Sequence, residues 1–225
     1  MVRKSIPTFI SKTMTPLFLD NHILIADKPW GLLTQPSGTD EWSLEAECKA
    51  YLKERFNKPG AVFLEAIHRI DRVVGGVVLF ARTSKALSRL NALQRSNSIR
   101  KTYVARVAPP PTQSAGHLED WLRHDEHHAS IVTADTPGAL RCRLDWRRLA
   151  LDGASALLEI DLQTGRYHQI RAQLAHAGMP IVGDRKYGSR MASTVDDGIA
   201  LLSARIEFEH PVTHEKISVS SKLRV

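Results

Sequence analysis

The spacing of apolar and polar positions along the chain predicts many short strands and a smaller number of helices. Strands are expected where apolar residues alternate with polar ones or cluster in short runs, at residues 22–26, 77–81, 101–107, 140–147 and 158–162. This follows because successive side chains of a strand point to opposite faces of a sheet. The run at 77–81 is apolar throughout, which indicates a strand buried on both faces.

Three segments have the longer period of a helix. Ser43 is placed to cap a helix whose apolar positions extend to Phe56, and Ser84 is placed to cap a helix with leucines at 87, 90 and 93. A third helix is predicted over residues 168–177, because Gly178 and Pro180 then end it. Since strands outnumber helices and follow one another, we expect an α+β domain with a largely antiparallel, mixed sheet and flanking helices.

Composition is compatible with one such domain that binds a polyanion. The 225 residues can bury a self-sufficient core. The 31 basic and 24 acidic residues give a net charge of +7, as in RNA-binding, ribosomal and membrane-surface proteins. Cys48 and Cys142 form no paired framework, which favours a reduced, cytoplasmic setting. The sequence has no apolar run of membrane-spanning length, and we expect a monomer that binds no membrane.

The run from His68 to Arg72 contains the most informative acid of the chain. Asp71 lies between Arg69 and Arg72, just before two glycines and the predicted buried strand. A carboxylate that stays ionised while partly desolvated needs such cations, because burial disfavours its charged form. Asp71 is therefore a candidate catalytic group, although an ordinary salt-bridged acid at a strand end fits the same pattern.

Other candidate groups have weaker signals. His68 and His168 are of a type used in acid–base catalysis, but structural hydrogen bonding is the favoured interpretation of both. The polar run with histidines at 124, 127 and 128 is more typical of a solvated loop than of a metal site. The phosphate-binding motifs GxxxxGK[ST] and GxGxxG are both absent from the sequence, so nothing indicates a nucleotide cofactor. Arginines at 141, 143 and 147 either contact phosphates or form a solvated strand face.

Five ordered blocks carry a resemblance to a known family. They read KPWGLLTQPSG at 28–38, HRIDRVVGGVVLFART at 68–83, RKTYVARVAP at 100–109, TGRYHQIRAQLAHAGMPIVGDRKYGS at 164–189 and LLSARIEFEHPVTHE at 201–215. Together they resemble the RluA-type family of RNA pseudouridine synthases over roughly residues 20–220. The resemblance implies the pseudouridine synthase fold with a central basic cleft. It places a catalytic domain at 20–225 after an extension at 1–19, and we expect no S4-type domain.

The resemblance also assigns roles to four residues. Asp71 would be the catalytic acid, and Arg171 would pair with it although it lies in the first turn of a helix, where a cation opposes the helix dipole. Tyr103 would stack on the target uracil. Arg69 would either fill the gap left by the extruded base or act as a second counter-charge to Asp71, and both interpretations stay open.

The implied reaction converts uridine to pseudouridine within ribosomal or transfer RNA. The N1–C1′ bond breaks, the bound uracil turns, and C5 joins C1′. Whether Asp71 attacks the sugar or abstracts a proton is left open. Atoms are only rearranged, so the reaction needs no redox cofactor or nucleotide energy.

The chain departs from the family pattern directly after the catalytic acid. The family continues with a polar residue and then Thr-Ser-Gly or similar, whereas Val73, Val74, Gly75 and Gly76 stand here. The missing hydroxyls leave room for an alternative, a non-catalytic RNA-binding relative that remodels RNA. A glycoside hydrolase is a more distant alternative, because it needs a second carboxylate and none lies near Asp71 in the sequence.

Overall fold

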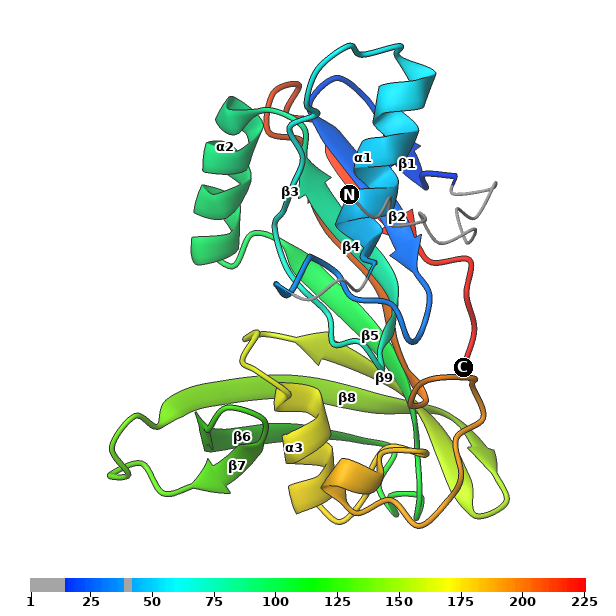
Figure 1. Ribbon diagram of the computed structural model, residues 1–225. Coiled ribbons are helices and arrows are strands. Elements are labelled where there is room, and N and C mark those ends of the chain that lie inside the picture. The colour runs from blue at the N-terminus through cyan, green and yellow to red at the C-terminus, as the bar shows by residue number, and fades with distance from the viewer. Residues whose placement is uncertain (1–14, 39–41) are drawn as a thin grey trace.

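The computed structural model describes residues 15–38 and 42–225, and it shows an α+β domain built on one large sheet (Figure 1). The helices are α1 (Leu44–Arg55), α2 (Ser84–Arg95), α3 (Gln169–His176) and the short 3-10 helix η1 (Arg185–Tyr187). The first six strands are β1 (Phe18–Leu19), β2 (Ile23–Lys28), β3 (Glu65–Ala66), β4 (Gly75–Ala81), β5 (Arg100–Val107) and β6 (Ala115–His124). The others are β7 (Ala129–Val132), β8 (Leu140–Asp152), β9 (Ser155–Leu162), β10 (Leu201–Glu209) and β11 (Lys216–Ser220).

The strand order confirms the predicted sheet type. Neighbouring strands run in the order β1-β2-β4-β10-β5-β9-β8-β6-β7, with β11 paired to β10 and β3 to β4. Among the strands of the described residues only β4 and β10 pair in parallel, where Gly75 faces Leu202 and Gly76 faces Ser203. The sheet is thus mixed and largely antiparallel. The expected extension at 1–19 lies mainly outside the described residues, but Phe18 and Leu19 already pair with β2.

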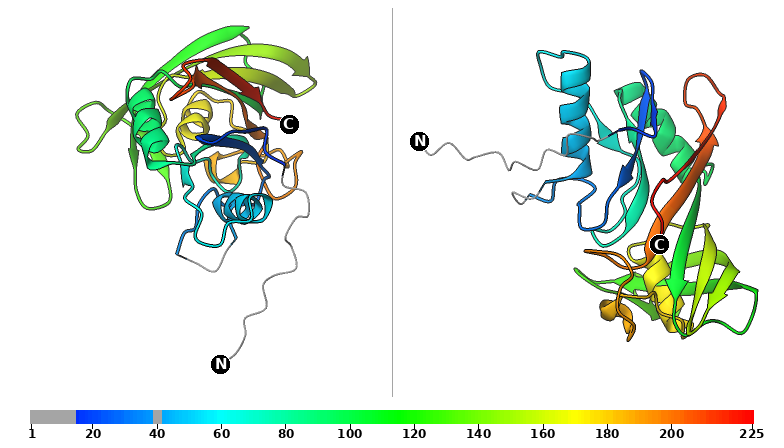
Figure 2. Two further views of the ribbon diagram at one scale, coloured as in Figure 1. Left: turned by 90° about the horizontal axis from the view of Figure 1, so that it is seen from above. Right: turned by 90° about the vertical axis from the view of Figure 1, so that its right-hand side faces the viewer.

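Helices cover the two halves of the sheet differently. In Figure 1 α1 and α2 flank the half around β2 and β4, and α3 lies over the half formed by β6, β7 and β8. Figure 2 shows α3 and η1 next to each other, and the two elements are in contact. No helix in the described ranges is both long enough and apolar enough to cross a bilayer.

Alternation along β2 and β4 explains why this half has helices on two faces. Leu24 and Phe80 belong to the main core together with residues of α1, whereas Ile25 and Leu79 belong to a second core that packs on α2. All seven residues of β4 are buried, as the apolar run predicted.

The helix starts agree with prediction in one case and differ in two. The Ser43 hydroxyl accepts the backbone N–H of Ala46, as expected of an N-cap. The second cap was placed wrongly by one residue, because Thr83 accepts the N–H of Ala86 and Ser84 is already helical. The third helix begins at Gln169, since His168 has φ 53°, outside the helical region.

Two adjacent glycines let β4 approach its neighbours closely. A Cβ atom on Gly75 would lie 2.7 Å from the Trp30 ring, and one on Gly76 would lie 2.2 Å from the Ser203 carbonyl oxygen. Gly76 also has φ +111°, which L side chains rarely adopt. Gly75, which stands where the family pattern has a serine, therefore permits close packing against Trp30 beside the candidate site.

Gly76→Ala should lower the free energy of unfolding by about 3 kcal/mol, because the methyl group collides with the β10 backbone at a disfavoured φ. Gly60→Ala is the matched control, since a Cβ atom there meets nothing within 4 Å and Gly60 has no left-handed φ. Urea unfolding of both variants checks this. Equal stabilities of the two variants would contradict the close approach of β4 and β10.

Candidate active site

Asp71 lies in the short loop between β3 and β4, and both of its chain neighbours are fixed. Thr34 donates its hydroxyl hydrogen to the Ile70 carbonyl at 2.8 Å and accepts the Ile70 N–H at 3.3 Å. On the other side, the Gly31 N–H donates to the Arg72 carbonyl at 2.9 Å. The Asp71 side chain is 26% exposed. The loop therefore presents one carboxylate to solvent from a restrained backbone.

Arg171 contacts this carboxylate and a second, buried one at the same time. Its Nη1 atom donates to Asp71 Oδ2 at 3.0 Å, so the predicted pairing across 100 residues of sequence is present. Its Nε and Nη2 atoms donate to the two oxygens of Asp184 at 2.7 and 2.9 Å. Asp184 is only 1% exposed. The guanidinium is therefore locked by a bidentate bond to a buried acid and presents its remaining nitrogen to Asp71.

The same contacts explain how a cation is tolerated at the start of α3. Arg171 is the third residue of α3, where the helix dipole disfavours positive charge. Burial alone would lower the pKa of Arg171, but the hydrogen bonds and charge of Asp184, and then of Asp71, raise it above its usual value. The guanidinium is therefore charged throughout the neutral range. Asp184 was not found from the sequence, although it lies in the resembled block at 164–189.

His168 completes the arrangement as a neutral side chain. Burial, followed by the charges of Arg171 and Lys186, lowers the pKa of His168 to about 3. Its Nε2 atom accepts from Arg171 Nη1 at 2.9 Å, so its Nδ1 atom carries the hydrogen and donates to the Tyr187 hydroxyl at 2.8 Å. The 3.3 Å separation of Nε2 from Asp71 Oδ2 is then no ion pair. Both atoms accept hydrogens from one guanidinium nitrogen, and the expected structural role of His168 is present.

Aromatic rings surround this set. The exposed Tyr167 ring stacks on His168 with centroids 3.9 Å apart, and the Arg171 guanidinium lies 4.9 Å from the centroid of the Tyr187 ring. The His124 ring lies against Tyr167, and the His128 ring stacks on Tyr187. The described residues contain no group of three or more His, Cys, Asp or Glu that could hold a metal ion.

Lys28 is a second residue that the sequence analysis missed. It is fully buried, and its Nζ atom donates to the carbonyls of Pro29, Leu32 and Arg72 at 3.0, 2.6 and 3.2 Å. The pKa of Lys28 is lowered to about 7, mainly by burial. The Asp71 charge opposes this shift, and the Arg72 charge adds to it. Lys28 thus ties the 28–32 segment to the residue next to Asp71. Its place at the start of the KPWG block was the available signal.

The Tyr103 side chain is buried, whereas the Arg69 side chain is exposed to solvent. Tyr103 is buried on β5, and its pKa is raised to about 12, mainly by burial. A hydrogen bond with Ser203 opposes this shift, and the Asp71 charge adds to it. Its stacking on uracil stays a prediction. Arg69 is exposed and forms no ion pair with Asp71 in the described ranges, so Arg171 is the counter-charge.

The arginine-rich face of β8 is largely neutralised. Arg141 pairs with Glu119 on β6 at 2.5 Å, and Arg147 pairs with Glu159 on β9 at 2.9 Å. All four side chains are at least partly exposed. The solvated-face interpretation is therefore favoured at these two positions over contact with phosphates.

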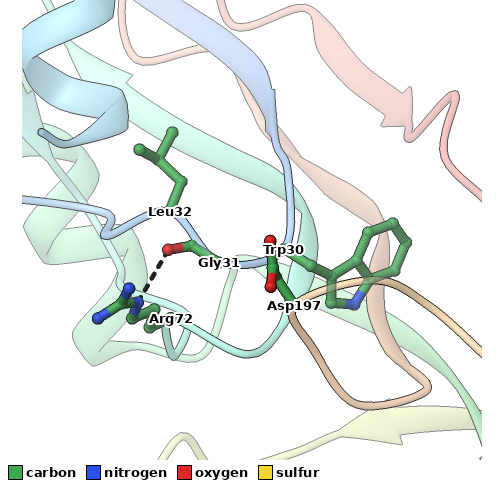
Figure 3. Close-up of a pocket in the computed structure, with 5 residues that line it drawn as sticks. All are labelled: Trp30, Gly31, Leu32, Arg72 and Asp197. Atoms are coloured by element: carbon green, nitrogen blue, oxygen red, sulfur yellow. Dashed lines mark hydrogen bonds between the residues drawn. The ribbon is translucent and has the colours of Figure 1, made fainter. Parts of the chain in front are cut away.

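A polar pocket of about 360 Å³ adjoins the Asp71 loop (Figure 3). It is lined by Trp30, Gly31, Leu32, Arg72 and Asp197. Arg72 donates from Nε to the Gly31 carbonyl at 2.9 Å, the contact drawn in Figure 3. The pocket therefore shares its wall with the restraints that hold Asp71.

Asp184→Asn should lower the free energy of unfolding by about 3 kcal/mol, because it leaves the buried Arg171 charge with one carboxylate fewer. Asp161→Asn is the matched control. The two oxygens of Asp161 also accept from the Nε and Nη2 atoms of an arginine, Arg100, but this pair is exposed to solvent. An exposed pair of this kind contributes less than about 1 kcal/mol. Similar losses in both variants would show that the Asp184 pair is not effectively buried.

The neutral histidine predicts a pH dependence. His168 has a lower pKa in the folded protein than in the unfolded chain, so the folded state binds fewer protons. The contribution of His168 to the free energy of unfolding is therefore fully present above about pH 6.5 and is lost as the pH falls toward 3. His168→Asn, which tolerates the left-handed φ, removes one such group. The stability difference between native protein and variant should shrink by about 1.4 kcal/mol per pH unit between pH 6 and 4.

Urea unfolding across this pH range measures the difference. His214→Asn is the control, because His214 is exposed. Parallel stability curves for native protein and the His168 variant would overturn the neutral state assigned to His168.

Comparison with known proteins identifies the family to which the chain is related. A family model described as RNA pseudouridylate synthase matches residues 22–176. The chain is 32% identical over 213 residues to ribosomal large subunit pseudouridine synthase C of Vibrio cholerae, covering 92% of this chain and 65% of that protein. It is 29% identical over 203 residues to the uncharacterized RNA pseudouridine synthase YhcT of Bacillus subtilis, covering 89% and 66%. The chain thus spans just under two thirds of the length of these relatives.

Solved structures show the same fold. Human RNA pseudouridylate synthase domain containing 4 superposes with a TM-score of 0.75 at 21% identity, covering 92% of this chain and 88% of that one. Human RNA pseudouridylate synthase domain containing 1 gives 0.71 at 17% identity, covering 96% and 85%. Since the family model matches well over half of the sequence, the chain belongs to the RNA pseudouridylate synthase family.

Proposed function

We propose that this chain is an RNA pseudouridine synthase, an isomerase that converts uridine to pseudouridine with Asp71 as the catalytic residue. The observation that carries the proposal is the state of the Asp71 carboxylate. Its Oδ2 atom accepts the bond from Arg171. Its Oδ1 atom accepts no hydrogen bond from any residue that the structure describes. One oxygen is thus held while the other is open to a substrate.

This geometry suits a reaction that needs one ionised, oriented carboxylate. The reaction breaks the N1–C1′ bond and forms the C5–C1′ bond, so no atom is gained or lost. Asp71 Oδ1 would either attack C1′ of the ribose or remove a proton from the sugar. Arg171 orients the carboxylate in both cases, because its own position is fixed by Asp184.

The same contacts disfavour the two alternatives. A glycoside hydrolase needs a second carboxylate that reaches the substrate or a water, but both oxygens of Asp184 bind Arg171 and the side chain is buried. A non-catalytic RNA chaperone needs only a basic surface. It has no use for a carboxylate oxygen kept open beside a locked guanidinium.

We propose a uridine of ribosomal RNA as the substrate, because a relative at 32% identity is named for the large ribosomal subunit. The uridine must leave its stack to reach Asp71, at a cost of a few kcal/mol unless it lies in a loop. Exposed Arg69 is free to fill the vacated space, and Tyr103 would contact the uracil. One chain supplies every residue of this site, which supports action as a monomer.

Asp71→Asn should lower isomerisation by at least about 10³-fold, because the open oxygen loses its charge and nucleophilicity. The RNA affinity and the fold should be retained. Asp152→Asn is the matched control, since Asp152 also pairs with an arginine, Arg106, but on the surface. Incubation with total ribosomal RNA and mapping of pseudouridine measures the activity.

The products separate the three functions. Pseudouridine made by the native chain supports the isomerase, released uracil would indicate a hydrolase, and unchanged RNA would indicate a binding protein. Substantial isomerisation by Asp71→Asn would remove Asp71 from the catalytic role.

A further inference from the structure

Lys101 is a buried cation without a counter-ion. It lies on β5 and is 8% exposed, and its Nζ atom forms no hydrogen bond or ion pair with any residue in the described ranges. Burial lowers the pKa of Lys101, and no nearby carboxylate offsets this. Buried charges are ordinarily paired, because desolvation without a partner is costly. The Nζ atom of Lys101 has no hydrogen-bond partner but is not fully buried, so it keeps some contact with solvent.

His68 gives a second unpartnered donor in the same place. The side chain is buried, and its Nε2 atom accepts the Leu79 N–H at 3.3 Å. Its Nδ1 atom therefore carries the hydrogen, and this atom is sealed from solvent without a partner among the described residues. The pKa of His68 is lowered to about 3, first by burial and then by the Lys101 charge, so that charge acts on His68. Of these two unpartnered donors, only Lys101 Nζ keeps contact with solvent, so it is the donor that an anionic ligand can reach.

Gly165 leaves the Lys101 ammonium uncovered. A Cβ atom at this position would lie 3.6 Å from Lys101 Nζ, and nothing else lies within 4 Å of it. Gly165 is exposed and has no left-handed φ, so its backbone does not require glycine. The absence of a side chain therefore opens a path from solvent to Nζ.

The position of Lys101 places this opening on the sheet face that carries Tyr103. Lys101 and Tyr103 are two residues apart on one strand, so their side chains share a face. His68 belongs to the loop that carries Asp71, and Gly165 belongs to the loop that leads into α3 and Arg171. Asp71 influences the pKa of Tyr103 but is no cause of the shift at Lys101. A ligand of Lys101 would therefore flank the group bound at Asp71.

We propose that Lys101 binds a phosphate of the RNA strand next to the target uridine, which enters over Gly165. This inference rests on the proposed function. A phosphate fits because it supplies the acceptors and the negative charge that the Lys101 ammonium lacks. Lys101 is thereby a substrate-positioning residue that touches the RNA backbone and not the uracil.

The test uses Lys101→Met and decauridylate RNA, with binding followed by fluorescence anisotropy from 50 to 200 mM KCl. Loss of one phosphate contact should make the slope of log affinity against log salt shallower by about 0.7. Without RNA, the same variant should unfold at a higher urea concentration than the native chain, because an unpaired buried charge is removed. Lys216→Met on β11 is the matched control, because Lys216 is exposed there. It should change neither value.

Opposite changes in stability and affinity distinguish this role from a structural one. If Lys101→Met leaves the slope of log affinity against log salt unchanged, the proposal is overturned, whether or not the variant is less stable. Gly165→Ala is a second variant in case Lys101→Met does not fold. It should keep the native urea midpoint and weaken decauridylate binding, and native affinity would place the phosphate elsewhere.

These measurements need no turnover. A chain that makes no pseudouridine but shows the expected slopes would refute the isomerase and keep the phosphate site. Normal pseudouridine formation with unchanged slopes would refute only the phosphate site.

Discussion

The bidentate bond between Asp184 and Arg171 is the interaction on which the rest of the site depends. It fixes a buried guanidinium at the first turn of α3, where neither the helix dipole nor burial favours a cation. The remaining nitrogen then donates to Asp71 and to the neutral His168. The carboxylate that we propose as catalytic faces solvent, but it is thus oriented from the interior of the protein by a buried charge.

The fold brings the members of this set together from distant parts of the chain. Asp71 precedes β4, Arg171 belongs to α3, and Asp184 precedes η1. The loop around Asp71 is held from the other side by Lys28 and Thr34, and the close packing of Gly75 and Gly76 fixes β4 immediately after it. The polar groups nearest to Asp71 are therefore immobilised by buried contacts, which is what preorganised electrostatic stabilisation requires.

The sequence predicted the class of the fold and part of the site. Periodicity identified the buried strand at 77–81 and the cap at Ser43, because these depend on local pattern alone. It misplaced the second cap by one residue, since Thr83 and Ser84 both have hydroxyls. The pairing of Asp71 with Arg171 came from the family resemblance, not from the pattern. Asp184 and Lys28 were missed, because their roles depend on side-chain contacts between segments that no local pattern describes.

A double-mutant cycle on Asp184→Asn and Asp71→Asn tests most directly whether one guanidinium is shared by two carboxylates. Urea unfolding gives the free energy of unfolding of the native chain, both single variants and the double variant. Either single variant leaves Arg171 one carboxylate, but the double variant leaves a buried cation unpaired. The structure therefore predicts a combined loss that exceeds the sum of the single losses by at least about 1 kcal/mol. Losses that add to within about 0.5 kcal/mol would contradict the shared charge.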